Sequence, residues 1–399
     1  MKIQTRKIKL LPTEYSSFRP EIHEFFLERV LPKSQKILDP WAGHASFLPY
    51  FELGGVSAHF NDILPIHYFL NQAKTFHVAD SVLHSNLGII AKHHLIELLA
   101  PLDNYKLTIS AKWMDDDILN IFTQAWNEID TSPEILKIFS RAIVLLCVRP
   151  YCSIGDSLNP TWLKPGGMCT GENVETIVSS HIAKFHDFYD TVYRDVHPEK
   201  VNHNTITFSL SDAEFIDLND TFDTIFTSPP YCNRLDIYRL YNPELAFLGA
   251  LGYNVSNPNI LGTNIIKDFE GNGEFTFIQS VSPQTAHFLL NVRRLGKRRE
   301  NNYYFRYHCR YYSKLFRSIL KFIGTLQSGG SLYIVVQDNR HRGEPIPTAE
   351  FLIDFFTGMG LKAQVLFEAL RHHLGKRNVS SDFPAIIKKH KESIVGVEI

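Results

Sequence analysis

The sequence is poor in cysteine, and its cysteines follow no metal-binding or redox pattern. The chain of 399 residues has five cysteines and 18 histidines, without a C-x-x-C pair or a zinc-ligand spacing. We therefore expect no metal and no disulfide framework, as in a reduced, cytoplasmic protein. The longest wholly apolar run, Ala142–Val148, is too short to cross a bilayer, and residues 1–11 lack the apolar core of a secretory signal. No membrane association is expected.

Charge of one sign is also lacking, and so are two common nucleotide-binding motifs. The formal net charge is −1, which argues against bulk electrostatic binding of nucleic acid but permits a local basic face. Hydrophobic residues at 44% and charged residues at 21% exclude the disordered and collagenous classes. Neither GxxxxGK[ST] nor GxGxxG occurs in the chain.

The pattern of apolar residues predicts an α/β fold with a parallel sheet. A strand at Lys36–Asp39, a helix over 46–53 and a strand over 56–60 form a β-α-β unit. Helical periodicity then dominates residues 66–200, which we interpret as a mainly helical insertion. Residues 241–300 read as polar and rich in loops. The remaining predicted elements are strands over 205–210, 222–227, 332–336, 361–367 and 383–388, and helices over 303–326, ended by Gly329-Gly330, and over 348–356.

A first candidate site lies at Asp39-Pro40-Trp41-Ala42-Gly43, directly after a predicted strand. In doubly wound sheets, ligands bind outside the carboxyl ends of strands, and Gly43 allows close approach of the backbone. Asp62 ends the next predicted strand, where a carboxylate suits the two hydroxyls of a ribose. The pattern fits nucleoside binding and a simple turn about equally well.

A second candidate site is Ser228-Pro229-Pro230-Tyr231, which follows the predicted buried strand 222–227. Prolines donate no N–H, so the carbonyls near them remain acceptors, and Ser228 adds a side-chain acceptor. Tyr231 offers a flat face for stacking. Acceptors beside a ring suit a planar substrate that carries an amino group, because holding both N–H bonds frees the nitrogen lone pair. The alternative is a proline-stiffened turn.

A third feature is basic and aromatic. Between Arg293 and Arg317 there are nine Lys or Arg residues and one acid, Glu300, interleaved with tyrosines and Phe305. We assign the aromatic residues at helical spacing to the core. The basic cluster that precedes the predicted helix is the candidate for phosphate contact, and it comprises Arg293, Arg294, Lys297, Arg298 and Arg299.

Together these motifs resemble the amino-methylating DNA methyltransferases that use S-adenosylmethionine. Asp39-Pro40-Trp41-Ala42-Gly43 resembles their cofactor motif, and Ser228-Pro229-Pro230-Tyr231 matches their catalytic motif in the form typical of cytosine-N4 enzymes. Phe18-Arg19-Pro20-Glu21 resembles the segment that often precedes the cofactor motif. Asp62 resembles the acid after the second strand, and Ser211-Asp212 occupies the position that contacts the adenine ring. A second glycine is usual where this chain has Ala45, which a negative φ would accommodate.

The resemblance implies a Rossmann-like methyltransferase sheet with helices on both faces. It implies S-adenosylmethionine as cofactor, held by Phe18, Asp39, Pro40, Trp41, Gly43, Asp62 and Asp212. Double-stranded DNA is the implied substrate, with Tyr231 stacked on a flipped base whose amine meets Ser228 and the Pro229 carbonyl. The chain has no Pro-Cys dipeptide, so we expect no cysteine nucleophile, and Cys232 is assigned no catalytic role.

The chain is divided accordingly into a catalytic core and segments for target recognition, and alternatives for the function stay open. Residues 1–65, 205–240 and 301–399 are assigned to the catalytic core, whereas 66–204 and 241–300 are candidates for target recognition. Cytosine N4 is the first expected target and adenine N6 the second, in a restriction-modification or related system with a cognate endonuclease as a further partner. The rivals are an RNA methyltransferase and a catalytically silent module that binds the cofactor and nucleic acid.

Overall fold

The computed structural model describes most of the chain. The described residues are 10, 18–105, 112–155, 163–167, 169, 171–193, 205–232, 236–255, 260–263, 272–294, 298–341, 344–374 and 387–399. Within them, no helix combines the length and apolarity that crossing a membrane requires.

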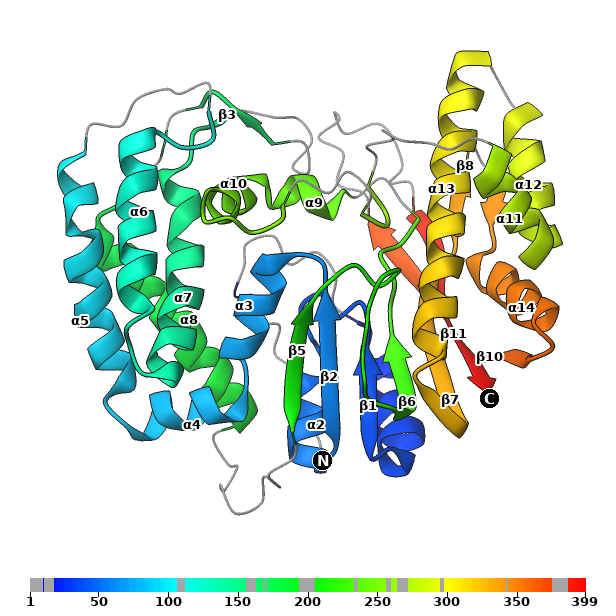
Figure 1. Ribbon diagram of the computed structural model, residues 1–399, viewed down its shortest axis with the longest axis horizontal. Coiled ribbons are helices and arrows are strands. Elements are labelled where there is room, and N and C mark those ends of the chain that lie inside the picture. Colours follow the sequence, from blue (N-terminus) through cyan, green and yellow to red (C-terminus); the bar gives the residue numbers. More distant parts are fainter. Residues whose placement is uncertain are drawn as a thin grey trace. The chain divides into compact units, whose positions relative to one another are not determined.

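A mainly parallel sheet of seven strands, flanked by helices, confirms the predicted α/β class (Figure 1). Its order is β10-β11-β7-β6-β1-β2-β5. The pairs β1/β6, β6/β7 and β2/β5 are parallel, whereas β11 runs antiparallel to both β7 and β10. The strands are β1 (Lys36–Asp39), β2 (Ser57–Asp62), β5 (Ile206–Leu210), β6 (Phe222–Thr227), β7 (Leu326–Gln337), β10 (Lys362–Leu374) and β11 (Ile387–Glu398).

The chain forms two compact units, and the first comprises residues 1–33, 42–210 and 236–257. Its helices are α1 (Pro20–Phe25), α2 (Leu48–Gly54), α3 (Pro65–Ala73), α4 (Phe76–His84), α5 (Leu87–Leu99), α6 (Asp116–Ile129), α7 (Glu134–Val148), α8 (Val174–Tyr193), α9 (Ile237–Leu240) and α10 (Asn242–Ala250). A short hairpin joins β3 (Ile154–Gly155) to β4 (Lys164–Pro165). The apolar run 142–148 is wholly buried in α7, so the longest hydrophobic stretch of the sequence forms the centre of this helical layer.

The second unit comprises residues 34–41, 211–235 and 258–399. Besides its strands it contains α11 (Asn272–Val281), α12 (Pro283–Arg294), α13 (Arg298–Ile323), α14 (Thr348–Gly358) and the hairpin of β8 (Asn339–His341) and β9 (Glu344–Ile346). Its core depends on α13, where buried aromatic and aliphatic side chains recur every three or four residues. Phe316 of α13 stacks on Phe355 of α14 with ring centroids 4.4 Å apart. The assignment of the helical aromatic residues to the core is confirmed for Phe305, Tyr307, Tyr311 and Tyr312, whereas Tyr303 is exposed.

Two expectations about individual elements were wrong, and a third is tested only in part. Gly329-Gly330 does not end the long helix, because α13 stops at Ile323 and β7 already begins at Leu326. Gly329, with a φ of +78°, lies where the pairing of β6 with β7 shifts its register. The described part of 241–300 is largely helical, since α10, α11 and α12 fall in it. The last strand covers 387–398, whereas most of the predicted strand 383–388 lies outside the described residues.

Candidate functional site

The two sequence motifs meet at the carboxyl ends of β1 and β6 in the second unit. These strands pair in parallel, with Leu38 opposite Ile225, so they end at the same edge of the sheet. Asp39 is buried, and its Oδ1 accepts hydrogen bonds from the Thr227 hydroxyl (2.6 Å) and the Trp41 N–H (3.2 Å). The residue that opens the first motif is therefore tied to the residue that directly precedes Ser228.

The segment 228–231 has no regular secondary structure and leaves the strand as an irregular turn. Pro229 is buried, whereas Ser228, Pro230 and Tyr231 are partly exposed. The Pro230 carbonyl accepts a hydrogen bond of 2.8 Å from the Tyr311 hydroxyl on α13. The sequence offered one signal for Tyr311, its place in the buried stripe of α13, but that stripe gave no reason to connect it with the turn.

Cys232 is 4% exposed, and its Sγ lies 3.2 Å from Nδ1 of His308. Burial raises the pKa of this thiol far above its usual range, against a smaller lowering by the Tyr307 hydroxyl. Because the thiolate is the reactive form, a thiol in this state is a poor nucleophile near neutral pH. The geometry therefore agrees with a role for Cys232 in packing.

The loop 42–45 in the first unit is held by polar side chains from α3 and by the end of β2. The Gly43 N–H donates to Asp62 Oδ2 at 2.7 Å, and its carbonyl accepts from Asn71 Nδ2 at 2.8 Å. Lys74 Nζ donates to the His44 carbonyl at 2.9 Å. Gly43 has a φ of +50°, and a Cβ built on it would meet no atom within 4 Å. The backbone at Gly43 is thus fixed in a left-handed conformation with open space beside it.

Ala45 departs from the expectation of a negative φ, because its φ is +46°. Among the described residues it is the only non-glycine residue with a positive φ. The left-handed conformation costs an alanine about 1–2 kcal/mol, since Cβ approaches the following carbonyl oxygen. Ala45 is 2% exposed, so its methyl group is packed inside the fold while its backbone is strained.

Asp62 supports the loop more extensively than the sequence predicted. Besides the Gly43 bond, its Oδ1 accepts from the Leu64 N–H at 2.8 Å, and Nδ1 of His67 lies 3.3 Å from Oδ2. Burial alone would raise the pKa of Asp62, but His67 and the two N–H groups outweigh it, so the pKa is lowered. Each carboxylate oxygen has two lone pairs, which leaves acceptor capacity for a ligand hydroxyl.

Histidines and a tyrosine that the sequence analysis did not select lie beside this loop. The rings of His44 and His67 are 4.8 Å apart, and the Tyr241 hydroxyl lies 3.3 Å from Nε2 of His44. Burial lowers the pKa of His44 well below its usual value, and His67 and Lys74 lower it further, so the ring is neutral. The sequence contained a signal for these contacts, because residues 67, 71 and 74 have the i, i+4, i+7 spacing of one helix face.

Asp212 makes contacts that the prediction of an adenine contact did not include. Its Oδ2 lies 2.6 Å from Nζ of Lys314, a lysine of α13 that is 7% exposed. Glu214 Oε2 lies 3.3 Å from the same ammonium. The Asp212 carboxylate is therefore part of a nearly buried ion cluster, and the adenine contact stays a prediction.

The other residues assigned to cofactor binding are engaged in packing. The Phe18 ring lies 4.8 Å from the ring of Phe47 in the first unit. In the second unit, Pro40 is buried and Trp41 packs edge-to-face on Phe322, with ring centroids 5.1 Å apart. Direct cofactor contact by these side chains stays a prediction.

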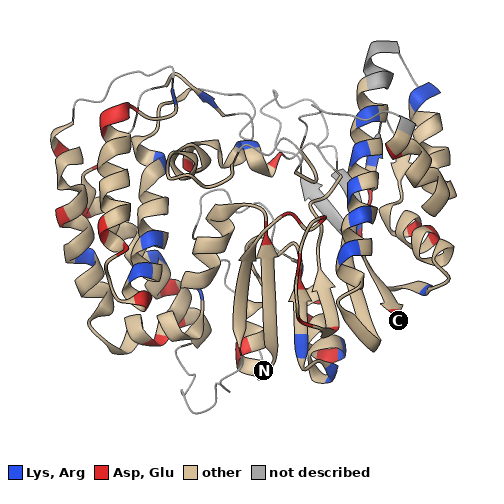
Figure 2. Ribbon diagram, in the orientation of Figure 1, with Lys and Arg blue, Asp and Glu red and all other residues tan. Residues whose placement is uncertain are grey.

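The basic cluster is described only in part. Arg293 and Arg294 are exposed at the end of α12, and the Arg293 guanidinium lies 5.2 Å from the ring centroid of Phe305. Lys297 lies outside the described residues, as do the side chains of Arg298 and Arg299 at the start of α13. Figure 2 shows further basic residues along α13. Contact of this cluster with phosphate stays a prediction.

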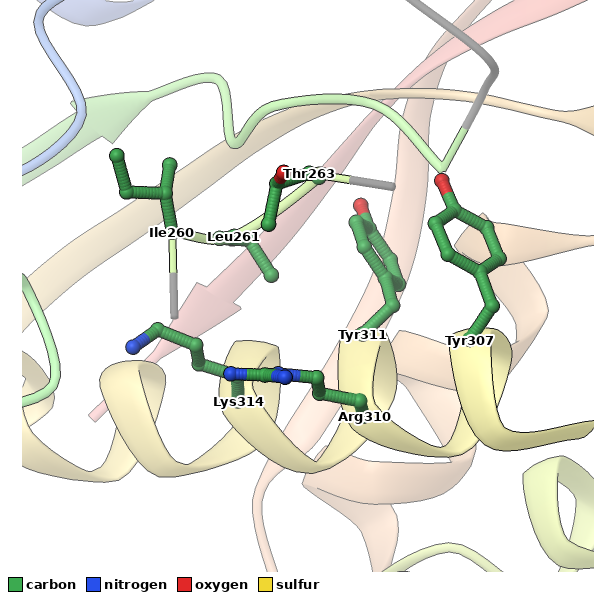
Figure 3. Close-up of a pocket in the computed structure, with 8 residues that line it drawn as sticks. Ile260, Leu261, Thr263, Tyr307, Arg310, Tyr311 and Lys314 are labelled. Atoms are coloured by element: carbon green, nitrogen blue, oxygen red, sulfur yellow. The ribbon is translucent and has the colours of Figure 1, made fainter. Parts of the chain in front are cut away.

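A small indentation lies between α13 and residues 260–263 in the second unit. From α13 it is lined by Tyr307, Arg310, Tyr311 and Lys314 (Figure 3). Its lining thus includes both Lys314, which pairs with Asp212, and Tyr311, whose hydroxyl donates to the Pro230 carbonyl.

Comparison with known proteins gives one short similarity. No family model matches the chain. A segment of 34 residues is 64% identical to the Type II methyltransferase M.BsoBI of Geobacillus stearothermophilus. The chain thus resembles part of a methyltransferase. The matched segment covers 8% of this chain and 7% of that protein, so the similarity spans a small fraction of both.

The described residues include no group of three His, Cys, Asp or Glu side chains arranged to hold a metal ion. The groups present at the end of β6 are the Ser228 hydroxyl, the carbonyls of the two prolines and the Tyr231 ring. These groups can hold and orient a planar amine, and the buried Cys232 offers no activated nucleophile.

Proposed function

We propose that this protein is an S-adenosylmethionine-dependent DNA methyltransferase that modifies the exocyclic amine of a flipped-out base. Cytosine N4 is the first expected target, and adenine N6 is the second. The observation that carries the proposal is the hydrogen bond between Asp39 and Thr227, which ties the cofactor-like motif to the Ser-Pro-Pro-Tyr turn at one sheet edge. The short similarity to a Type II methyltransferase supports it.

The proposed reaction is a direct displacement at the methyl carbon. The amine nitrogen would form a bond to that carbon while the carbon–sulfur bond breaks, S-adenosylhomocysteine would leave, and the proton lost from nitrogen would pass to solvent. The Ser228 hydroxyl and the Pro229 carbonyl accept hydrogen bonds from the two N–H groups of the amine, which localises the lone pair on nitrogen. Tyr231 stacks on the base, an interaction worth about 1–3 kcal/mol.

The loop at Gly43 has features that fit the cofactor. Its left-handed glycine leaves open space beside the backbone, and Asp62 at the end of β2 retains acceptor capacity for a ribose. S-adenosylmethionine would supply the activated methyl group. Asp212 fits an adenine amine only by sharing its carboxylate with Lys314.

The amine of a paired base cannot reach a methyl donor inside the stack, so the base has to leave the duplex. We assign phosphate contact to Arg293, Arg294, Lys297, Arg298 and Arg299, and target recognition to 66–204, 241–300 or both. A restriction-modification context with a cognate endonuclease remains part of the proposal.

The test is methyl transfer by the purified protein from labelled S-adenosylmethionine to mixed-sequence duplex DNA and to RNA. Digestion to nucleosides and mass spectrometry identify the product, and we expect N4-methylcytosine in DNA. N6-methyladenine would favour the second target, and label in RNA alone would favour an RNA methyltransferase. Cofactor binding without product on either nucleic acid would identify a silent module and refute the proposal.

Variants of the turn test the direct mechanism in single-turnover assays. Loss of a well-placed acceptor in Ser228→Ala should slow transfer by about 10²-fold, by analogy with lost oxyanion donors. Tyr231→Ala should lose base stacking, whereas Tyr231→Phe keeps the ring. Cys232→Ser should be close to neutral. An inactive Cys232→Ser beside an active Ser228→Ala would contradict direct transfer.

A further inference from the structure

The carbonyl of Pro230 is held from a distant part of the chain. Tyr311 lies 81 positions later, on α13, and its hydroxyl donates to that carbonyl at 2.8 Å. Tyr311 is 3% exposed, so its side chain is fixed by the surrounding core. Burial raises the pKa of the Tyr311 hydroxyl well above its usual value, which keeps it protonated and able to donate.

A second contact reaches the same proline from residues 260–263. Gly262 has a φ of +85°, a conformation that side chains rarely adopt. A Cβ on Gly262 would lie 3.0 Å from Cβ of Pro230 and 3.7 Å from the Tyr231 carbonyl oxygen. Any larger residue at this position has to displace the turn or the loop.

We propose that Tyr311 and Gly262 are positioning residues that hold Pro230, so that Ser228 and the Pro229 carbonyl present the acceptors for the target amine. This inference rests on the proposed function. The Tyr311 hydroxyl turns the second proline carbonyl toward the protein core, and the close approach of Gly262 limits movement of the proline ring. Because misplacement of a reacting group by about 1 Å can slow a reaction by about 10²-fold, small movements of this turn matter.

The experiment compares Tyr311→Phe with Tyr312→Phe. Both remove one hydroxyl from a buried ring of α13, but the Tyr312 hydroxyl faces Thr348, with 3.5 Å between the oxygens. Hydrogen exchange of the peptide over 222–232 measures the mobility of the turn without any need for activity. Single-turnover transfer and the affinity for S-adenosylhomocysteine are measured beside it.

We expect Tyr311→Phe to speed exchange at Tyr231 and Cys232 and to slow transfer by about tenfold, with unchanged affinity for S-adenosylhomocysteine. Tyr312→Phe should leave the exchange and the transfer rate unchanged. Gly262→Ala should speed exchange in the same peptide while Tyr311 is intact, and it serves as the second variant if Tyr311→Phe does not fold.

Equal exchange in both tyrosine variants and in Gly262→Ala would overturn the positioning role. Faster exchange with an unchanged transfer rate would show that the turn is held but not for catalysis, and this too overturns the inference. If the unmodified protein transfers no methyl group, the proposed function fails, whereas the exchange comparison still decides whether these residues hold the turn.

Discussion

Removal of the buried ammonium group at Lys314 is expected to destabilise the protein strongly. Lys314 lies within 2.6 Å of Asp212 and 3.3 Å of Glu214, and the three side chains are 8%, 12% and 16% exposed. Lys314→Met keeps most of the apolar stem but leaves two carboxylates without their shared cation. Breaking a buried pair by removing one partner typically costs about 3–5 kcal/mol.

Urea denaturation followed by far-ultraviolet circular dichroism measures this cost. Lys112→Met is the matched control, because Lys112 pairs with Asp116 on the surface, where both side chains are more than 60% exposed. An exposed pair of this kind contributes little to stability, because water screens the two charges and both side chains lose freedom. The double variant Lys314→Met/Asp212→Asn also removes the charge of one carboxylate that has lost its cation. Its loss of unfolding free energy should therefore be smaller than the sum of the losses in the two single variants.

The opposite result would change the interpretation of Asp212. If Lys314→Met costs no more than Lys112→Met, the ion cluster does not stabilise the fold, and Asp212 is available for a ligand. If the cost is large and Asp212→Asn leaves the affinity for S-adenosylhomocysteine unchanged, the adenine contact predicted from the sequence is wrong.

Three further measurements test other parts of the structure. Asp62→Ala should weaken binding of S-adenosylhomocysteine by about tenfold or more in calorimetric titration, because each charge-assisted hydrogen bond is worth about 1.5–3 kcal/mol; unchanged affinity in a folded variant would remove the ribose assignment. Neutralising Arg293 and Arg294 should reduce the slope of log K against log salt for duplex DNA by about 0.9 per lost phosphate contact, and an unchanged slope would return them to a solvated face. Burial raises the pKa of Glu52 to about 7, although hydrogen bonds from Tyr193 and the Phe76 N–H lower it. The protonated Glu52 side chain therefore stabilises the fold fully below the unfolded pKa of 4.5, and this stabilisation is lost as the pH rises through about 7. Between about pH 5.5 and about pH 8 this loss is roughly 2 kcal/mol, and Glu52→Gln should abolish it in denaturation experiments at the two pH values.

The strands β1, β2, β5 and β6 were largely predictable, because each is short and ends at a polar or turn residue. The strands Lys36–Asp39 and Phe222–Thr227 were predicted to the residue, and β2 was found with a small shift. The long β11 was missed, since its first half, Ile387–Lys391, carries three lysines and a histidine without an apolar face.

The candidate site was predictable at the level of motifs but not of contacts. The ends of β1 and β6 meet because the two strands pair in parallel, and this neighbour relation, which brings Asp39 to Thr227, comes from the structure. The partners that complete the site, Tyr311 and Lys314, come from more than 75 residues away. Their hydrogen bonds depend on how a core helix packs, which one sequence does not specify.

The left-handed pair Gly43 and Ala45 has a consequence for how a ligand would be received. An alanine disfavours a positive φ, so the surrounding contacts, and not its own preference, hold Ala45 at a φ of +46°. Hydrogen bonds to Asp62 and Asn71 restrict the neighbouring glycine in the same way. A ligand that binds this loop therefore has little disorder to remove, and preorganisation of this kind raises affinity without any additional contact. The strain at Ala45 thus accompanies a loop that already has its conformation before a ligand binds.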